Sequence, residues 1–265
     1  MKTTTDYPLV SIITPSYNQG QFIEATILSV INQTYKNIQY IVVDGGSTDN
    51  TMDVVNKYKD KIDIIIHEKD KGQSDALNKG FKLATGVIAG WINSDDILYD
   101  TCVEKIVETL ISHPDGVIYY PSTLDYIDQD GKLLASRSSK ITDKSYLLNI
   151  DYDVIQQGSF YRVSTLKLIN FVDENIYYCM DLDLWLRLLN HGKIHYYDGP
   201  SLAAIRRWEE TKTNLSGVKF IDNIKDVIKI HGASSLSKTQ FKLRYMKFKI
   251  IGGKIKRTFL KGISK

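Results

Sequence analysis

Short apolar runs alternate with amphipathic segments along the first 120 residues of the chain. The runs are rich in β-branched side chains and end in polar or glycine-containing clusters, as buried strands do. They predict strands at residues 10–14, 38–43, 62–66, 87–92 and 117–120. Between the runs, apolar residues recur every three or four positions, which is the spacing of an amphipathic helix. Helices are therefore predicted at about residues 22–33, 50–58, 74–84 and 103–111.

This alternation predicts an α/β fold with a mostly parallel central sheet and helices on both of its faces. From Pro121 the pattern changes to a hairpin-like stretch around Gln129-Asp130-Gly131 and to helices interrupted by Asp-rich loops. No linker stands out before about residue 215. The expected units are one domain over residues 1–215, with halves at about 8–120 and 121–215, and an extension at 216–265.

Composition and length favour a folded, soluble chain. The 265 residues suffice for one large domain, and no apolar run approaches the roughly 20 residues that span a bilayer. Residues 1–6 contain no apolar signal core, so we expect a cytoplasmic protein. Cys102 and Cys179 lack disulfide or metal-site spacing and are expected to be packing residues.

Positive charge is concentrated at the C-terminal end. Residues 238–265 contain ten Lys or Arg and no acid, which leaves 24 basic against 31 acidic side chains elsewhere. Apolar residues interleave with the basic ones, and this favours a basic helical tail that adsorbs to an anionic membrane surface. The alternative, with equal weight, is a tail that packs against the acidic body. Nucleic acid is not expected as a partner, because the tail lacks a recognisable binding fold.

Distinctive side chains follow three of the predicted strands. Pro15 and Tyr17 come after the first strand, Asp44 ends the second, and Asp95 and Asp96 follow the fourth. The carboxyl ends of parallel strands lie along one edge of a sheet, so these residues should converge on one crevice. The adjacent carboxylates suit Mg²⁺ or Mn²⁺ held together with phosphates, and the ring and Asp44 suit a base. The competing hypothesis for the Asp pair is that it caps the following helix.

Four segments resemble motifs of family 2 inverting glycosyltransferases with the GT-A fold. They are residues 10–18 (VSIITPSYN), 33–35 (QTY), 42–49 (VVDGGSTD) and 93–96 (NSDD). The resemblance covers about residues 8–215 and implies a bacterial surface-polysaccharide type of enzyme. Such an enzyme would move a sugar from a nucleoside diphosphate, expected to be UDP, to a glycan or polyprenyl-linked acceptor, with inversion at the anomeric carbon. It would work in the cytoplasm or peripherally at the inner face of the cell membrane.

The resemblance also implies a role for individual residues. The first half of the domain would bind the nucleotide, and the second half would bind the acceptor. The donor site would consist of Pro15 and Tyr17 at the base pocket, Asp44 on the base, Asp75 near the ribose or diphosphate, Asp95 on the ribose, and Asp96 on Mn²⁺ or Mg²⁺.

Inverting transfer needs a base that deprotonates the acceptor hydroxyl. Residues 180–188 (MDLDLWLRL) look like the acidic base motif of the family, and Asp181 aligns with its usual base. Met180 stands where a Glu is common, so one supporting carboxylate is missing. The competing role for Asp181 is that of a helix N-cap. We expect Asp183 and Trp185 to be structural.

Residues 206–213 are similar to a late segment in which many relatives carry a His that approaches the metal or diphosphate. Trp208 occupies that position. Either Asp96 and phosphate oxygens are then the only metal ligands, or Arg206 or Arg207 supplies charge to the leaving diphosphate.

Two rival functions remain open on the sequence. A nucleotidyltransferase would show a glycine-rich basic loop after the first strand, and residues 14–18 (TPSYN) are not one. The dinucleotide and P-loop fingerprints are also missing from the sequence. A non-catalytic nucleotide-sugar or glycan binding protein stays open because of Met180 and Trp208.

Overall fold

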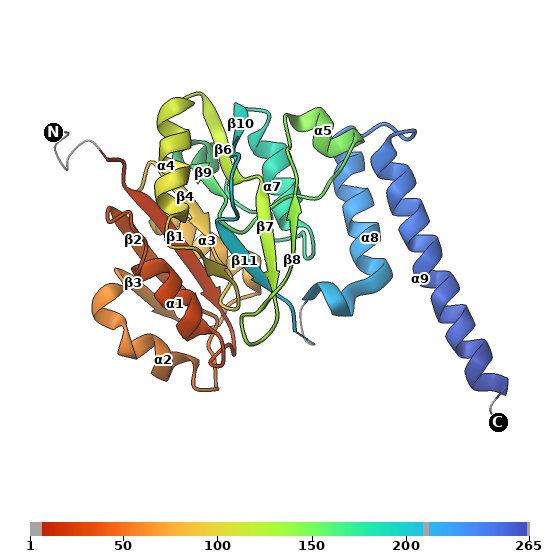
Figure 1. Ribbon diagram of the computed structural model, residues 1–265, viewed down its shortest axis with the longest axis horizontal. Helices are drawn as coiled ribbons and strands as arrows, with labels where there is room; N and C mark the ends of the chain where they lie inside the picture. Colours follow the sequence, from red (N-terminus) through yellow and green to blue (C-terminus); the bar gives the residue numbers. More distant parts are fainter. Residues whose placement is uncertain (1–6, 209–211, 264–265) are drawn as a thin grey trace.

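The computed structural model describes residues 7–208 and 212–263, with side chains described at 7–208 and 218–250 (Figure 1). A seven-stranded sheet in the order β10-β6-β9-β4-β1-β2-β3 forms the centre of the molecule. Its strands are β1 (Val10–Ser16), β2 (Ile38–Asp44), β3 (Ile64–His67), β4 (Ile88–Trp91), β6 (Gly116–Pro121), β9 (Phe160–Arg162) and β10 (Lys193–Tyr197). All neighbouring strands run parallel except β9, which is antiparallel to β4 and β6. The predicted mostly parallel sheet is therefore confirmed.

A second sheet of four strands, in the order β5-β11-β7-β8, lies beside the first. Its members are β5 (Ile97–Leu98), β7 (Thr123–Ile127), β8 (Leu133–Ser138) and β11 (Ala203–Arg206). The hairpin predicted around residues 129–131 is the turn between β7 and β8. The sheet as a whole was not predicted, because β5 is only two residues long and β11 lies far along the chain.

Helices cover both faces of the central sheet, as predicted (Figure 1). One face carries α1 (Ile23–Ile31), α2 (Thr51–Lys57), the short 3₁₀ turn η2 (Lys59–Lys61) and α4 (Cys102–Ser112). The other carries α3 (Gln73–Leu83), α6 (Val163–Leu168) and α7 (Met180–Leu188), and α5 (Lys144–Asn149) lies beyond them. The amide of Asn78 in α3 exchanges hydrogen bonds of 2.9 and 3.0 Å with the backbone of Val172, which holds α3 beside the segment after α6.

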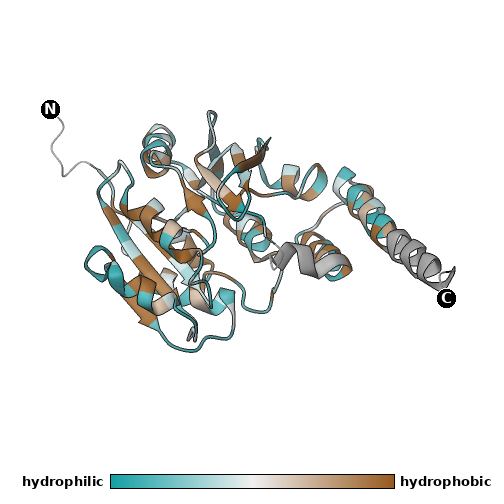
Figure 2. Cartoon of the chain, turned by 60° about the horizontal axis from the view of Figure 1, so that its bottom comes forward, coloured by the Kyte–Doolittle hydropathy of each residue, from teal (hydrophilic) through white to brown (hydrophobic). Residues whose placement is uncertain are grey.

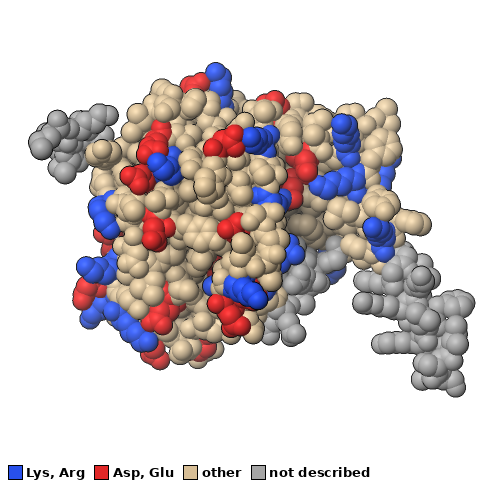
Figure 3. All heavy atoms as spheres, viewed as in Figure 1, with Lys and Arg blue, Asp and Glu red and all other residues tan. Residues whose placement is uncertain are grey.

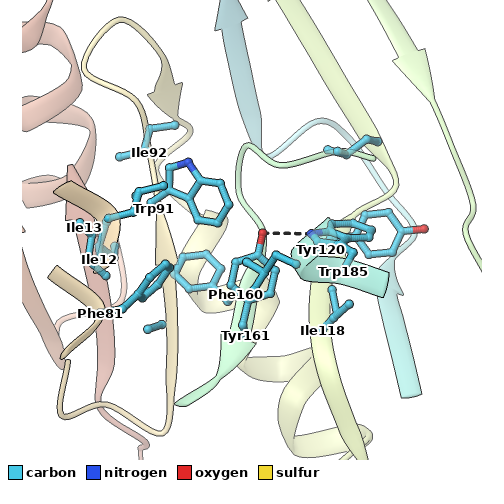
Figure 4. Packing of buried hydrophobic residues seen from close by; sticks show 14 of the residues in the cluster. Ile12, Ile13, Phe81, Trp91, Ile92, Ile118, Tyr120, Phe160, Tyr161 and Trp185 are labelled. Atoms are coloured by element: carbon cyan, nitrogen blue, oxygen red, sulfur yellow. Dashed lines mark hydrogen bonds between the residues drawn. The ribbon is translucent and has the colours of Figure 1, made fainter. Parts of the chain in front are cut away.

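The core is built from strand residues and the inner faces of these helices (Figure 2). Figure 4 shows its aromatic part, in which the ring of Trp91 packs between Phe81 and Tyr161 at centroid distances of 5.9 and 5.6 Å. The indole of Trp185 is fully buried and donates a 3.0 Å hydrogen bond to the Tyr161 hydroxyl. This confirms Trp185 as a core residue. Cys102 and Cys179 are buried free thiols, as expected.

The C-terminal helices α8 (Lys212–Ile230) and α9 (Lys238–Ile263) pack on each other and on the body. The described part of α8 buries Ile221, Ile224, Val227 and Ile228. At its end, His231 pairs with Asp183 of α7 at 2.9 Å, and Arg187 pairs with the same carboxylate at 2.7 Å. Asp183 is thus structural, as predicted. The expected boundary near residue 215 falls inside α8.

Gly80 of α3 lies so close to Ile13 of β1 that a larger residue should destabilise the protein. A Cβ at residue 80 would lie 2.5 Å from Cγ2 and 2.8 Å from Cγ1 of Ile13. We expect Gly80→Ala to lower the free energy of unfolding by about 1–3 kcal/mol, because the core side chain must move. Lys82→Ala on the exposed side of the same helix should change it by less than about 0.5 kcal/mol. Urea unfolding measures both, and a Gly80→Ala protein as stable as the wild type would contradict the packing described.

Candidate active site

The carboxyl ends of β1, β2 and β3 bring three polar residues into one row. Ser16 is the register partner of Asp44, and Asp44 is the register partner of His67. Pro15 is buried within β1, whereas the Tyr17 ring just beyond it is 59% exposed. Tyr17 therefore offers an open flat surface at the edge where ligands bind in such sheets.

Backbone amides of the loop after β1 are tied to the loop after β2. The amides of Asn18, Gln19 and Gly20 donate to the side-chain oxygens of Ser47, Thr51 and Asp49, at 2.7, 2.9 and 3.0 Å respectively. Asn18 takes a left-handed conformation with φ 51°, which its short polar side chain tolerates. These bonds make one rigid rim from two loops.

The side chain of Asp44 is fully buried in this rim. Its Oδ2 accepts the backbone amides of Gly46 and Ser47 at 3.0 and 2.8 Å, and Nδ1 of His67 at 2.7 Å. Its Oδ1 accepts the hydroxyl of Ser47. The carboxylate thus shapes the turn after β2 and is already engaged on both oxygens.

Asp95 and Asp96 lie in a turn after β4, closed by a 3.0 Å bond from the Asp96 amide to the Asn93 carbonyl. The turn leads into β5, and the next helix, α4, begins only at Cys102. The competing hypothesis that these acids cap a following helix is therefore wrong.

Asp96 is only 1% exposed and is surrounded by N–H donors. Its Oδ2 accepts Nδ2 of Asn93 at 3.0 Å and Nε2 of Gln157 at 2.9 Å, and its Oδ1 accepts the Arg206 amide at 2.9 Å. Burial, and then the charge of Asp95, raise the pKa of Asp96 to about 8. Gln157 had no signal in the sequence, because an isolated Gln in a loop before a three-residue strand carries no pattern.

Asp95 is less enclosed than Asp96. Its Oδ2 accepts Nε1 of Trp208 at 3.1 Å. Burial raises the pKa of the Asp95 carboxyl, although the Trp208 bond and the charge of Arg206 act in the opposite direction. A bound cation would favour the charged forms of both carboxyls and so oppose the rise in their pKa values.

The guanidinium of Arg206 is used by the protein itself. Its Nε donates to the Asp95 carbonyl at 2.9 Å, and its Nη1 donates to the carbonyls of Asp128 and Gln129 at 3.0 and 2.8 Å. The residue is 5% exposed and stacks on Phe22. Arg206 is therefore an organiser of the turn after β4. Arg207 lies over the Tyr126 ring at 4.2 Å.

Asp75 lies in the first turn of α3, where its Oδ2 accepts the Lys71 amide at 3.0 Å. The neighbouring Gln73 donates from Nε2 to Oδ1 of Asn93 at 2.8 Å. The start of α3 is thus tied to the turn after β4, and Asp75 belongs to the same sheet edge as Asp95.

Asp181 lies in the first turn of α7, and its Oδ1 accepts the Leu182 amide at 2.8 Å. Burial raises the pKa of Tyr161 in β9, and the charge of Asp181 adds to that rise, which places the acid near β9. Beside it, Sδ of Met180 accepts the Ser74 hydroxyl at 2.9 Å. Met180 thus fills the space between α7 and α3.

The donor set at this edge fits a hard divalent cation held partly by substrate. Among the described residues, no group of three or more His, Cys, Asp or Glu side chains could hold a metal ion alone. Mg²⁺ sites in proteins commonly use one or two carboxylates and take their other ligands from phosphates and water. Asp95 is the less buried residue of the pair, whereas Asp96 already accepts three N–H bonds.

Comparison with known proteins finds a matching family model and several similar proteins. The model described as Glycosyl transferase family 2 matches residues 11–175. Uncharacterized glycosyltransferase RT0329 of Rickettsia typhi is 33% identical over 222 residues, 81% of this chain and 69% of its own length. An Escherichia coli protein named UDP-Glc:alpha-D-GlcNAc-diphosphoundecaprenol beta-1,3-glucosyltransferase WfaP is 31% identical over 189 residues, 69% of this chain and 71% of its length. The chain spans 29% of a similar Rickettsia bellii glycosyltransferase.

Two solved structures share the fold. S. aureus TarS 1–349 in complex with UDP-GlcNAc has a TM-score of 0.64 at 17% identity, covering 92% of this chain and 71% of that one. The mannosyltransferase PcManGT from Pyrobaculum calidifontis, in complex with GDP-Man and Mn²⁺, has a TM-score of 0.61 at 15% identity, covering 85% and 65%. The predicted GT-A type of α/β fold is confirmed.

The different surroundings of the two acids predict different costs of removal. Asp96→Ala leaves three buried N–H groups without an acceptor, so we expect the free energy of unfolding to fall by about 3 kcal/mol. Asp95→Ala loses one such bond and should cost less than about 1 kcal/mol. Urea unfolding of both variants in metal-free buffer measures the difference. A larger loss at Asp95 would contradict the division between an anchoring and an accessible acid.

Proposed function

We propose that the chain, which belongs to glycosyl transferase family 2 and is a glycosyltransferase, as its sequence predicted, uses a UDP-sugar as its donor. Transfer of the sugar inverts the configuration at its anomeric carbon. The sugar is transferred to a hydroxyl group of a glycan or of a lipid-linked molecule in surface-polysaccharide synthesis. One observation carries this proposal: an open aromatic ring, two acids after β4 and the start of α3 share one sheet edge, with α7 beside them.

The donor lies across the carboxyl ends of β4, β1 and β2. The base stacks on Tyr17 beside Pro15, and the ribose and diphosphate extend toward Asp75 and the turn at Asp95. UDP is favoured because WfaP is named for UDP-Glc and TarS is described with UDP-GlcNAc.

Asp95 is the metal ligand in this proposal, because it is the less buried of the two acids. The sequence pointed to Asp96 for the metal and Asp95 for the ribose, but Asp96 is buried with three N–H bonds. Asp96 fixes the turn, and Asp95 presents its carboxylate toward the diphosphate. Bound Mn²⁺ or Mg²⁺ would neutralise charge that develops on the departing diphosphate.

The general base is Asp181. It takes the proton from the acceptor hydroxyl as that oxygen attacks the anomeric carbon on the side opposite the diphosphate, which inverts the configuration. Met180 supplies no second carboxylate, so Asp181 works without an acid at the preceding position. Arg206 already donates its hydrogen bonds to carbonyls of the protein. The charge on the leaving diphosphate must therefore be neutralised by the cation or by other residues.

Release of UDP tests the reaction. The wild type, with a UDP-sugar, Mn²⁺ and a diphosphoundecaprenol-linked acceptor, should release UDP in proportion to glycosylated lipid. Asp181→Asn should bind UDP as tightly as the wild type but lose about 10²–10⁴-fold in the rate of transfer, because the proton has no acceptor. Isothermal titration and a UDP-release assay give the two quantities. Transfer by Asp181→Asn at the wild-type rate would exclude Asp181 as the base, and a wild type that binds no UDP-sugar would refute the function.

The proposed enzyme meets its lipid-linked acceptor at a membrane surface. None of the described helices is long and apolar enough to cross a bilayer. On α9, however, Phe241, Tyr245 and Phe248 are 57, 60 and 75% exposed and recur at helical spacing on one side. Leu243 on another side is fully buried, so the helix docks on the body and still presents an aromatic stripe.

The charge around this aromatic stripe matches an anionic surface. Lys238, Arg244 and Lys249 lie on the same part of α9. Lys242 and Lys247 lie there too but pair with Asp151 and Asp222. Arg244 lies over Phe241 at 5.9 Å, and Lys249 lies over Tyr245 at 5.0 Å. Figure 3 shows basic side chains on the described part of the C-terminal helices, at the right. Aromatic rings beside cations suit the headgroup region of an anionic membrane, where a lipid-linked acceptor would be met.

Vesicle binding tests this surface. The full chain should sediment with vesicles rich in phosphatidylglycerol and much less with phosphatidylcholine vesicles, and added salt should weaken the binding. The double variant Phe241→Ser, Phe248→Ser should bind at least about tenfold more weakly, because two rings no longer leave water. Leu133→Ser, Leu134→Ser, at two residues 55% exposed on β8, is the matched control and should bind as the wild type does. Equal binding of all three proteins would refute the surface.

A further inference from the structure

We propose that Trp208 is a positioning residue for the metal site: its indole N–H holds the carboxylate of Asp95 in the orientation that a divalent cation needs. This inference rests on the function proposed above, in which Asp95 is the metal ligand. Nε1 of Trp208 donates to Oδ2 of Asp95 at 3.1 Å. Among the described residues, no other side chain donates to this carboxylate. One indole therefore fixes the rotation of the carboxylate and leaves Oδ1 for a further ligand.

The indole ring is itself held in place by packing. It meets the Phe22 ring edge-on, with the centroids 5.1 Å apart and the planes at 64°. Phe22 is 8% exposed, and the guanidinium of Arg206 lies over its ring at 5.0 Å. The same guanidinium donates from Nε to the Asp95 carbonyl at 2.9 Å. The backbone and the carboxylate of Asp95 are thus held by one group of packed side chains, in which Trp208 is the member that contacts the carboxylate.

The residue type at position 208 decides what the side chain can do for a cation. An indole has one N–H donor and no acceptor nitrogen, so Trp208 cannot bind a metal ion through its ring nitrogen. A donor N–H stabilises the ionised carboxylate, which is the form that binds a cation. The chain therefore uses this position to orient a metal ligand and not to supply one.

Partners that orient a metal ligand have a measurable effect on metal affinity. Removal of such a partner commonly weakens the metal by about 10–100-fold, because the ligand then adopts several orientations. Contacts of the nucleotide with the protein do not depend on the Asp95 carboxylate in the absence of a cation. Loss of the Trp208 N–H should therefore weaken the cation alone.

The experiment measures Mn²⁺ binding to the full chain in saturating UDP, from the electron paramagnetic resonance signal of free Mn²⁺. Trp208→Phe keeps a ring against Phe22 and removes the N–H, and it should weaken Mn²⁺ at least about tenfold. Its affinity for UDP in metal-free buffer, measured by isothermal titration, should equal that of the wild type. In an Asp95→Ala background, Trp208→Phe should have no further effect on Mn²⁺, because the indole acts through that carboxylate.

Tyr99→Phe is the matched control. The Tyr99 hydroxyl donates to Oδ2 of Asp125 at 2.9 Å, so this variant also loses one hydrogen bond from an aromatic side chain to an Asp. It should bind Mn²⁺ as the wild type does.

A measurement on the wild type needs no variant. Addition of Mg²⁺ to the UDP complex should shift the indole N–H resonance of Trp208, because the carboxylate that it donates to gains a cation. The indole resonance of the buried Trp185, which donates to Tyr161, should stay in place.

The outcomes separate the inference from the proposed function. Wild-type Mn²⁺ affinity in Trp208→Phe overturns the inference. Equal weakening of Mn²⁺ and of metal-free UDP also overturns it, because a purely structural role of the ring would affect both. If Trp208→Phe does not fold, a Trp208 resonance that Mg²⁺ leaves unmoved has the same meaning. A wild type that binds UDP but no cation overturns the inference while UDP binding stands, whereas a wild type that binds no UDP refutes the proposed function and the inference with it.

Discussion

One buried carboxylate, that of Asp96, joins parts of the chain that are far apart in sequence. The carboxylate oxygens accept hydrogen bonds from residues 93, 157 and 206. The backbone carbonyl of Asp96 accepts the Thr26 hydroxyl of α1 at 2.7 Å. The central sheet, the small sheet and α1 thus meet at a single acid. The neighbouring Asp95 is held by the same turn, and also by Trp208 at its carboxylate and Arg206 at its carbonyl. A buried acid therefore fixes the position of the turn that carries Asp95.

The sequence predicted the elements whose patterns are long and local. Apart from β5, the strands and helices up to Pro121 were recognisable because their apolar residues repeat over four or more positions. β5 and β9 were not, since two or three residues have no period. The strand β11 pairs with β5 and β7 across large sequence separations, and no local signal specifies such a pairing.

The same limit applies to the site. Residue type and strand position predicted that Tyr17, Asp75 and Asp95 share one edge of the sheet, and they lie there. They did not predict burial, which depends on what packs above each side chain. Asp44 and Asp96 looked like ligand-binding acids by position, yet Ser47, Gln157 and Arg206 turn both inward. Arg206 could not be placed either, because its partners are carbonyls of a hairpin 77 and 78 residues earlier.

The pairing of His231 with Asp183 has a mechanical consequence. Asp183 is two residues after Asp181 on the short helix α7, and it pairs with His231 just after α8 and with Arg187 of its own helix. A force that tilts α8 would therefore turn the first helical turn of α7 and shift the carboxylate of Asp181. Adsorption of α9 would pull on this lever, because α9 packs against α8. Under the proposed function, binding at α9 and the position of the Asp181 carboxylate would be linked through α8.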